Sequence, residues 1–446
     1  MHLLRESVNP MKKQSLLKLF LTTALLCSLC LTGCGDKAGD TESSDSGSQD
    51  ANQDAQVDNA EDGEETPVGN STIEFTELAE DSYQERAIVR SRNLERIQNV
   101  MERAAKGEEL TIGYIGGSIT MGSGASSYKK CYASLVSDWW EKSFPDASFT
   151  FVNAGIGATD SKFACARCYD DLLQYNPDFV IVEFSVNDES HMAYSESYES
   201  LLRMILDYET NPALLILNMV TYNGGYNAQD IHNAVAFRYD LPAVSMKTSI
   251  YADIESGVLK ATDVSADMTH PNDLGHEYTA SIVTYFMEKV YAKGFEENFY
   301  EPYKLPDPTK TLVSINAKRH RNDTLQAELN GFTKDESKQN GITDVFKMGY
   351  EAKNEGDSMT FTVEGSRISI QYRKTNANNA PHGVAIIDGD EATAVELDGN
   401  FPGGWGDWLY YQTIYEGDAG EHTVEIRLTD SADKAFYLVS VITAQE

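Results

Sequence analysis

With 446 residues, of which 41% are hydrophobic and 10% aromatic, the chain is long enough for two domains with ordinary apolar cores. Its 36 basic and 70 acidic side chains give a formal net charge of −34. A surface this acidic repels phosphate backbones, which excludes nucleic acid as an expected partner. Composition therefore indicates a folded protein and leaves the kind of fold open.

The N-terminal segment has the pattern of an export signal. Residues 16–31 form an apolar run that is too short for a comfortable membrane span. The run leads into Leu-Thr-Gly-Cys, ending at Cys34, which resembles a bacterial lipobox. We expect residues 1–34 to be a signal peptide and Cys34 to carry a lipid that holds the protein at the extracellular face of the cell membrane; the alternative is an ordinary signal peptide with a chance cysteine. Residues 35–75 are acidic and poor in apolar side chains, which predicts a disordered tether.

Three cysteines remain beyond the signal peptide: Cys131, Cys165 and Cys168. The odd number leaves at least one thiol free or paired between chains. Cys165 and Cys168 lie one helical turn apart, but no second pair completes a zinc site. We expect buried small residues or one disulfide, and no metal.

Between residues 76 and 297, short apolar runs alternate with amphipathic segments. The strand-like runs cover residues 110–115, 149–152, 179–186, 214–220 and 243–246. The helix-like segments cover residues 90–105, 132–144, 163–175, 201–208 and 276–291. Strands that alternate with helices across short loops form a parallel sheet covered on both faces, so we predict a three-layer α/β/α domain.

A different pattern follows a proline-bearing linker at residues 298–310. Strand-like runs separated by Gly- and Asp-rich turns cover residues 359–363, 367–372, 383–387, 422–428 and 436–442. This spacing predicts an antiparallel β-sandwich, such as a jelly roll, as a smaller accessory domain over residues 311–446.

Four aromatic residues gather in this second domain: Trp405, Trp408, Tyr410 and Tyr411. They could form a platform on which sugar rings stack, with Trp405 and Trp408 as the carbohydrate-binding residues. The alternative is that they belong to the core of the sandwich, as aromatic residues of such domains often do. The sequence leaves both interpretations open.

Four segments with distinct chemistry follow the predicted strands or precede the last helix. In open parallel sheets, ligands bind outside the carboxyl ends of the strands. Ser118 follows two glycines at the first strand end, where the turn points its hydroxyl outward. The glycine-containing loop 153–158 can present backbone N–H groups, Asn187 can donate from its amide, and Asp267 lies three residues before His270. Each residue alone also has a purely structural interpretation, as a helix cap, an Asx turn or a surface loop.

In this order, the four segments resemble the four blocks of the SGNH (GDSL-like) hydrolase family, over about residues 110–291. The resemblance implies a flavodoxin-like parallel sheet, the SGNH hydrolase fold. It also implies a catalytic triad of Ser118, Asp267 and His270. Most members have Asp where this chain has Gly117, a position that is not the nucleophile.

The resemblance further implies an oxyanion hole built from the Ser118 N–H, the Asn187 amide and one N–H of the second block. By spacing from Asn153, the family's glycine in that block falls on Ala158, with Gly157 beside it. A backbone N–H serves from either residue, so both remain candidates. His276, near the start of the last helix, is interpreted as structural.

The expected chemistry follows from these groups. A serine hydroxyl is a weak nucleophile that needs a neighbouring base, so His270 is expected to take the proton of Ser118 while Asp267 orients the imidazole. No metal or organic cofactor is needed. The sequence thus predicts an extracellular carboxylester hydrolase that removes acetyl or other small acyl groups from a polysaccharide or oligosaccharide. The alternatives are a lipase- or lysophospholipase-like acylhydrolase and a non-catalytic cell-surface binding protein.

Overall fold

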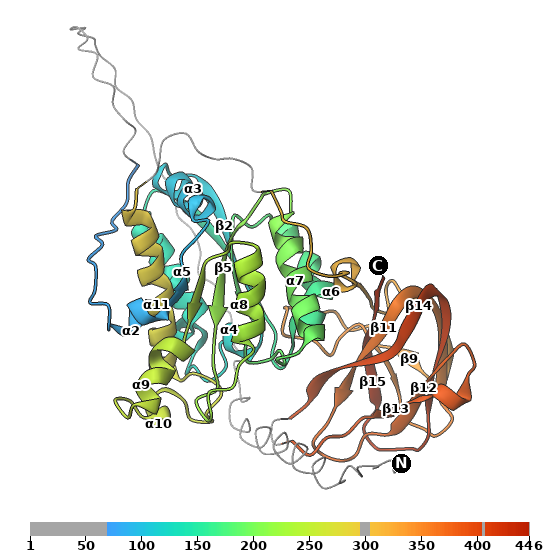
Figure 1. The fold of residues 1–446 in the computed structure, drawn as a ribbon. Helices are drawn as coiled ribbons and strands as arrows, with labels where there is room; N and C mark the ends of the chain where they lie inside the picture. Colours follow the sequence, from blue (N-terminus) through green and yellow to red (C-terminus); the bar gives the residue numbers. More distant parts are fainter. Residues whose placement is uncertain (1–68, 295–303, 404–405, 446) are drawn as a thin grey trace, which may run out of the picture.

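Two β-sheets, each with its own apolar core, organise the chain in a computed structural model that describes residues 69–294, 304–403 and 406–445 (Figure 1). The predicted signal peptide with Cys34, most of the predicted tether, part of the linker and Trp405 lie outside the described residues. No helix within these ranges is both long and apolar enough to cross a membrane.

The first sheet is mixed and has the strand order β1-β6-β5-β4-β2-β3. Its parallel strands are β2 (Glu109–Gly116), β3 (Ser148–Gly155), β4 (Phe179–Glu183), β5 (Ala213–Asn218) and β6 (Ala243–Ser245). The short edge strand β1 (Ile88–Arg90) runs antiparallel to β6. Without β1, the order is that of flavodoxin-like sheets, in which the switch point lies between β2 and β4.

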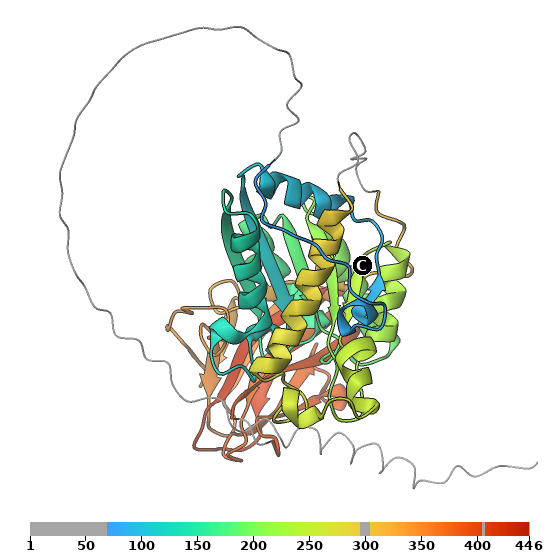
Figure 2. The same cartoon turned by 90° about the vertical axis from the view of Figure 1, so that its left-hand side faces the viewer.

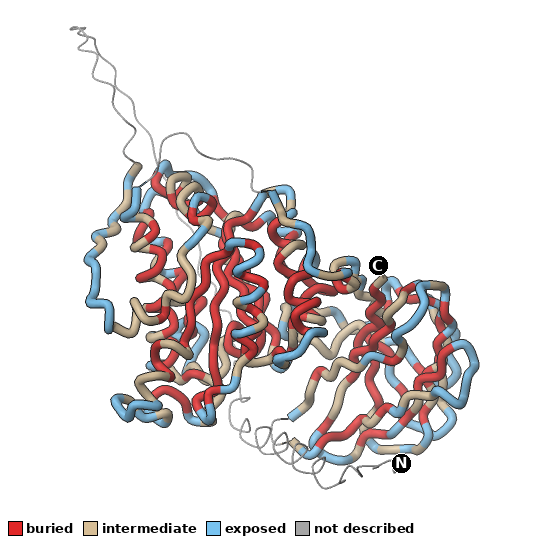
Figure 3. The backbone as a smooth tube through the Cα atoms, viewed as in Figure 1, coloured by how far each residue is buried: buried red, intermediate tan, exposed pale blue. Residues whose placement is uncertain are grey.

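Helices cover both faces of this sheet (Figures 1 and 2). One face packs against α3 (Glu95–Ala105), α5 (Tyr132–Ser143) and α11 (Asp273–Ala292). The other packs against α6 (Ser161–Asp171), α7 (Met192–Leu206) and α8 (Gln229–Arg238). Four further helices are short: α2 (Tyr83–Ala87), α4 (Ser118–Met121), α9 (Ala252–Glu255) and α10 (Ala261–Val264). The predicted three-layer α/β/α fold is confirmed, and its central strands are almost wholly buried (Figure 3).

Three local boundaries were predicted wrongly, and one helix was missed. The helix predicted from residue 90 begins only at Glu95, because Asn93 has a left-handed backbone with φ of 50° and the chain before it pairs as β1. The strand predicted for 179–186 ends at Glu183. Helix α8 was not predicted, and α7 begins at Met192 rather than at residue 201.

The second sheet is antiparallel and has the strand order β13-β12-β14-β11-β15-β10-β9, with β7 on β15 and β8 on β11. Its strands are β7 (Lys318–His320), β8 (Ala327–Asn330), β9 (Thr333–Lys334), β10 (Tyr350–Ala352), β11 (Ser358–Lys374), β12 (His382–Ile387), β13 (Val395–Asp398), β14 (Trp408–Leu428) and β15 (Phe436–Ala444). The predicted all-β domain is confirmed. Runs 359–363 and 367–372, predicted as two strands, are one strand with an irregular register between Gly365 and Arg367. Both halves of β11 contribute side chains to one core.

The two domains pack against each other through an apolar patch, here termed the interdomain cluster. It joins Ile156, Phe163 and Ala166 of the first domain to Leu409, Tyr437, Val439 and Ile442 of the second. In Figure 1, α6 and α7 lie between the first sheet and the C-terminal domain. The second domain therefore completes a core that begins in the first.

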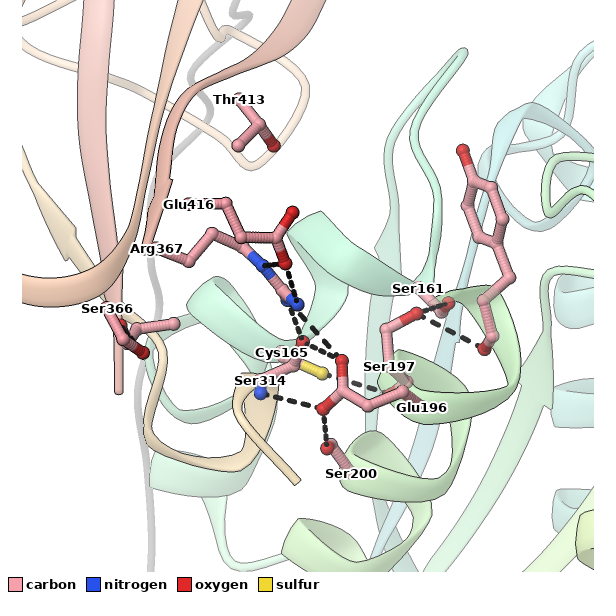
Figure 4. A network of polar contacts seen from close by, with 12 residues as sticks. Ser161, Cys165, Glu196, Ser197, Ser200, Ser314, Ser366, Arg367, Thr413 and Glu416 are labelled. Atoms are coloured by element: carbon pink, nitrogen blue, oxygen red, sulfur yellow. Dashed lines mark hydrogen bonds and ion pairs between the residues drawn. The ribbon is translucent and has the colours of Figure 1, made fainter. Parts of the chain in front are cut away.

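A polar network beside this cluster explains why the start of α7 escaped prediction. Glu196 of α7 accepts hydrogen bonds from the backbone N–H of Ser314 at 2.8 Å and from its hydroxyl at 2.7 Å. Arg367 of β11 lies 3.4 Å from the same carboxylate (Figure 4). Farther along the helix, Glu199 accepts a hydrogen bond from the N–H of Thr309 at 2.9 Å. The first turns of α7 are thus buried although polar, because their partners come from the segment that leads into the second domain.

Candidate active site

The sheet places two of the predicted segments side by side. Strands β2 and β4 are neighbours, with Gly116 paired to Glu183 at their carboxyl ends. Ser118 follows as the first residue of α4, and Gly117 is the N-cap of that helix. Asn187 follows β4 in a turn closed by a hydrogen bond from its N–H to Phe184 O at 3.0 Å. Both segments lie at the switch point, where open α/β sheets bind ligands.

The serine, imidazole and carboxylate of the predicted triad meet in one hydrogen-bonded chain. His270 Nε2 lies 2.8 Å from Ser118 Oγ, and His270 Nδ1 lies 2.6 Å from Asp267 Oδ2. A carboxylate only accepts hydrogen bonds, so Nδ1 carries the proton and Nε2 is left to accept the serine hydroxyl. The His270 and Asp267 side chains are 12% and 19% exposed, which leaves the chain shielded yet accessible.

Asp267 is fixed by the loop that carries it. Its Oδ1 accepts the backbone N–H groups of Thr269 at 2.9 Å and His270 at 2.7 Å. The left-handed conformation of Met268, with φ of 65°, folds the loop so that both N–H groups reach the same oxygen. Burial by itself raises the pKa of Asp267, but the hydrogen bonds and charge of His270 outweigh it and leave this pKa well below its ordinary value. Asp267 is therefore ionised beside the imidazole.

The loop after α4 supports His270 from behind. Gly124 has φ of 91°, and a Cβ there would lie 3.0 Å from His270 Cβ and 2.2 Å from Pro271 O. Asp273 holds the same loop by accepting hydrogen bonds from the N–H and the hydroxyl of Ser126, both at 2.7 Å.

His276, near the start of α11, is fully buried between Tyr132 N and Ser123 O, and burial lowers its pKa to about 4. It is a neutral, structural histidine, as the sequence indicated.

The second block lies beside the nucleophile. A Cβ built on Gly157 would lie 3.9 Å from Ser118 Cβ. Ala158 is exposed and has φ of 55°, the left-handed region that glycine enters without steric cost. This conformation gives a physical reason for the family's glycine at the position that spacing assigned to Ala158. Gly157 and Ala158 both remain candidates for the N–H donor.

Asn187 accounts for the departure at Gly117. A Cβ built on Gly117 would lie 2.1 Å from Asn187 Oδ1 and 2.9 Å from its Cγ. The amide of Asn187 therefore occupies the space that a side chain at position 117 would need. With Oδ1 packed on Gly117, the amide NH₂ is left to donate.

Three buried charged side chains support these loops, and the sequence analysis singled out none of them. Glu183 ends β4 and accepts the Thr120 hydroxyl at 3.1 Å. Asp188 accepts the N–H of Ser161 at 2.9 Å and pairs with His232 at 2.9 Å. Arg167 reaches the ends of β2 and β3 from α6. Only Glu183 left a signal in the sequence, because a single Glu inside an apolar strand run indicates a buried carboxyl.

Other predicted residues lie away from the triad chain. Trp408 begins β14, is half-buried, and packs on Phe401 and Tyr410 with ring centroids 5.4 and 4.8 Å apart. Tyr411 packs against the interdomain cluster. The cysteines, whose alternatives were burial or one disulfide, are all buried and unbridged: Cys131, Cys165 and Cys168. Within the described ranges, no group of three or more His, Cys, Asp or Glu residues is arranged to hold a metal ion.

A methyl group at position 117 should impair the site without unfolding it. In Gly117→Ala the new Cβ forces the partly exposed Asn187 side chain to rotate, so we expect kcat for p-nitrophenyl acetate to fall by about 10-fold to 100-fold. Ala158→Gly, which relieves a left-handed alanine, should keep kcat within about twofold. Wild-type turnover by Gly117→Ala would show that the position of Asn187 is unimportant.

Glu183 should make stability depend on pH. Burial, helped by the charge of Asp188, raises its pKa from the ordinary 4.5 to about 7, against hydrogen bonds from Thr120 and the Gly117 N–H. The folded state therefore binds this proton more tightly than the unfolded chain, and the resulting stability is present below pH 4.5 and lost as pH rises through 7. The difference corresponds to about 3 kcal/mol.

Glu183→Gln mimics the protonated carboxyl. Its free energy of unfolding relative to wild type should therefore increase by up to about 3 kcal/mol between pH 4.5 and 8, measured by urea denaturation. Glu109→Gln, at an exposed carboxyl of the same domain, is the matched control. A difference between Glu183→Gln and wild type that stays constant with pH would contradict the assignment.

The comparisons with known proteins agree with this geometry. The GDSL-like Lipase/Acylhydrolase family matches residues 114–278. A solved two-domain esterase active on acetylated mannans is 45% identical, with a TM-score of 0.79, over 81% of this chain and 98% of its own. The same esterase co-crystallised with mannopentaose gives 45% identity and a TM-score of 0.77 over the same shares. No curated protein sequence matches this chain.

The similarity to this esterase spans nearly all of its length, so it includes the second domain as well as the first. The family match contains Ser118, Asn187 and His270, which come from three of the four segments at the sheet edge. Identity of 45% over such a span establishes common family membership. This chain therefore belongs to the GDSL-like lipase/acylhydrolase family and is a serine esterase, a hydrolase that acts on ester bonds.

Proposed function

We propose that this esterase removes acetyl groups from acetylated mannans or their oligosaccharides. The observation that carries the proposal is the chain of hydrogen bonds from Ser118 through His270 to Asp267, at 2.8 and 2.6 Å. Support for the substrate class comes from the 45% identical esterase that is active on acetylated mannans, since the likeness covers both domains. No feature of the described residues favours a long-chain lipase over this activity.

In the proposed reaction, Ser118 Oγ attacks the carbonyl carbon of the acetyl ester while His270 Nε2 takes the hydroxyl proton. Asp267 holds the imidazole tautomer and stabilises the imidazolium. The tetrahedral oxyanion is bound by the Ser118 N–H, the Asn187 amide and the N–H of Gly157 or Ala158. When this intermediate collapses, the bond between the acyl carbon and the sugar oxygen breaks, and His270 gives its proton to that oxygen, so that the sugar leaves as an alcohol.

The acetyl group remains on Ser118 as an ester. A water molecule, deprotonated by His270, attacks this ester and releases acetate, and the proton returns to Ser118. Each step transfers one proton to or from the same nitrogen, His270 Nε2. The assignment of Ser118, Asp267 and His270 to these roles is part of the proposal.

Acetate release from acetylated mannan, with p-nitrophenyl esters of increasing chain length, tests the function. Ser118→Ala should lower kcat at least about 1,000-fold and abolish labelling by a fluorophosphonate, because the nucleophile is gone. The matched control is Ser127→Ala, at an exposed serine of the loop beyond α4. A preference for long acyl chains without acetate release from the glycan would replace the carbohydrate substrate with a lipid.

We further propose that a lipid on Cys34 anchors the enzyme outside the cell membrane, on the strength of the Leu-Thr-Gly-Cys motif and the acidic segment after it. When the full chain is made in bacteria fed a fatty acid with a clickable tag, it should incorporate the tag and sediment with membranes. Cys34→Ser should lose both properties, and Cys30→Ser, within the same apolar segment, should keep them. Tag incorporation into Cys34→Ser would contradict the anchor.

A further inference from the structure

Arg167 lies beneath the catalytic loops, and its side chain is fully buried. From α6 its guanidinium donates through Nη1 to Ala154 O at 2.7 Å and through Nη2 to Gly116 O at 3.1 Å. These carbonyls stand at the carboxyl ends of β3 and β2, the two strands that lead into the second and first blocks. One side chain thus joins the ends of both strands.

The carbonyls held by Arg167 belong to peptides whose N–H ends also face polar side chains. Gly116 O shares its peptide with the Gly117 N–H, which faces the Glu183 carboxyl. Ala154 O shares its peptide with the Gly155 N–H, which donates to Asn153 Oδ1 at 2.9 Å. Fixing both ends of a peptide fixes its plane, and with it the direction in which the chain leaves the strand.

The backbone N–H donors of the oxyanion hole lie within three residues of these two peptides. Ser118 N is one residue beyond the first peptide, and the candidate donors Gly157 and Ala158 lie two and three residues beyond the second. Glycine at position 155 permits the approach, since a Cβ there would lie 2.3 Å from Met121 N. The spacing between the two sets of backbone donors therefore depends on how the ends of β2 and β3 are held together.

A guanidinium suits this position for a physical reason. Its planar fork presents donors in fixed directions and can bridge two carbonyls at once, which an ammonium on a flexible stem does less well. Burying the charge is costly without partners, and Asp171 supplies an ion pair at 3.1 Å from Nη1. Asp171 compensates the charge, whereas the two carbonyls give the bridge its geometry.

The C-terminal domain packs against α6, the helix that carries Arg167, on the side that faces away from the sheet. Two guanidiniums contact the Phe163 ring, that of Arg167 at 5.4 Å and that of Arg319 of β7 at 5.1 Å from the ring centroid. Burial lowers the pKa of Arg319 to about 10. Phe163 and Ile156, which directly precedes Gly157, both pack in the interdomain cluster. The second domain thus covers Phe163 and Ala166 of α6, the helix that carries Arg167 and that lies between the first sheet and the C-terminal domain (Figure 1).

We propose that Arg167 is a positioning residue for the esterase reaction, bridging the ends of β2 and β3 so that their backbone donors surround the oxyanion. The C-terminal domain serves the same purpose by packing Phe163 against the guanidinium. This inference rests on the proposed function, because it concerns the hole that stabilises the transition state. It assigns the second domain a part in the chemistry in addition to any contact with the glycan.

The test compares Arg167→Lys and Arg167→Met with Asp171→Asn in the full chain, using p-nitrophenyl acetate and the rate of fluorophosphonate labelling. Lysine keeps the charge but reaches only one carbonyl, so kcat should fall by about 10-fold to 100-fold, with KM within about threefold. Arg167→Met, which can donate to neither carbonyl, should lower kcat more than Arg167→Lys does. Asp171→Asn removes the ion pair and leaves both carbonyl bonds, so it should lower the melting temperature while kcat stays within about twofold.

A variant in the interdomain cluster keeps the test decisive if the Arg167 variants do not fold. Phe163→Leu remains apolar but removes the ring that both guanidiniums contact, and it should lower kcat with KM unchanged. Wild-type kcat in Phe163→Leu, or in a folded Arg167→Lys that merely melts earlier, would overturn the positioning role. Inertness of the wild-type enzyme toward both probes would instead refute the proposed function itself.

Discussion

The peptide between Gly116 and Gly117 is the constraint on which the rest of the site depends. Its carbonyl accepts hydrogen bonds from Arg167 at 3.1 Å and from Ile156 N at 3.2 Å, and its N–H faces Glu183. The next residue is Ser118, so any rotation of this peptide would move the hydroxyl away from His270. Elements distant along the chain thus converge on one peptide. Helix α6 and the loop after β3 each donate a directional hydrogen bond to its carbonyl, and β4 places Glu183 beside its N–H.

The polar groups below the nucleophile differ in charge according to their surroundings. Asp267 is kept ionised by His270 and two backbone N–H groups, while burial raises the pKa of Glu183 to about 7 only a few residues away from Asn187. Asp267 can therefore orient an imidazolium during the reaction, whereas Glu183 acts mainly as a hydrogen-bonding group beneath the loop that carries Ser118. Environment rather than residue type separates the two roles.

Packing of the two domains is part of the same logic. The interdomain cluster covers Ile156 and Phe163, and the polar network around Glu196 joins α7 to Ser314 and Arg367 (Figure 4). Exposing these residues to water would uncover the helix layer that supports β2 and β3. The second domain therefore packs directly on the helices that support the catalytic strands and is not a freely tethered module.

The sequence by itself determined the strand and helix alternation of the first domain, the β character of the second, and the segments holding Ser118, Asn187, Asp267 and His270. These carry local signals: apolar periodicity, glycines at turns, and a three-residue spacing within one loop. Only the tertiary structure decided the burial of Arg167 and of the first turns of α7, whereas Glu183 left one local signal, its place inside an apolar strand run. Their partners lie far along the chain, as Gly116 lies 51 residues from Arg167 and Ser314 lies 118 from Glu196. A polar side chain whose partners are that remote looks like a surface residue in sequence, because hydrogen bonds between distant segments leave no periodic pattern.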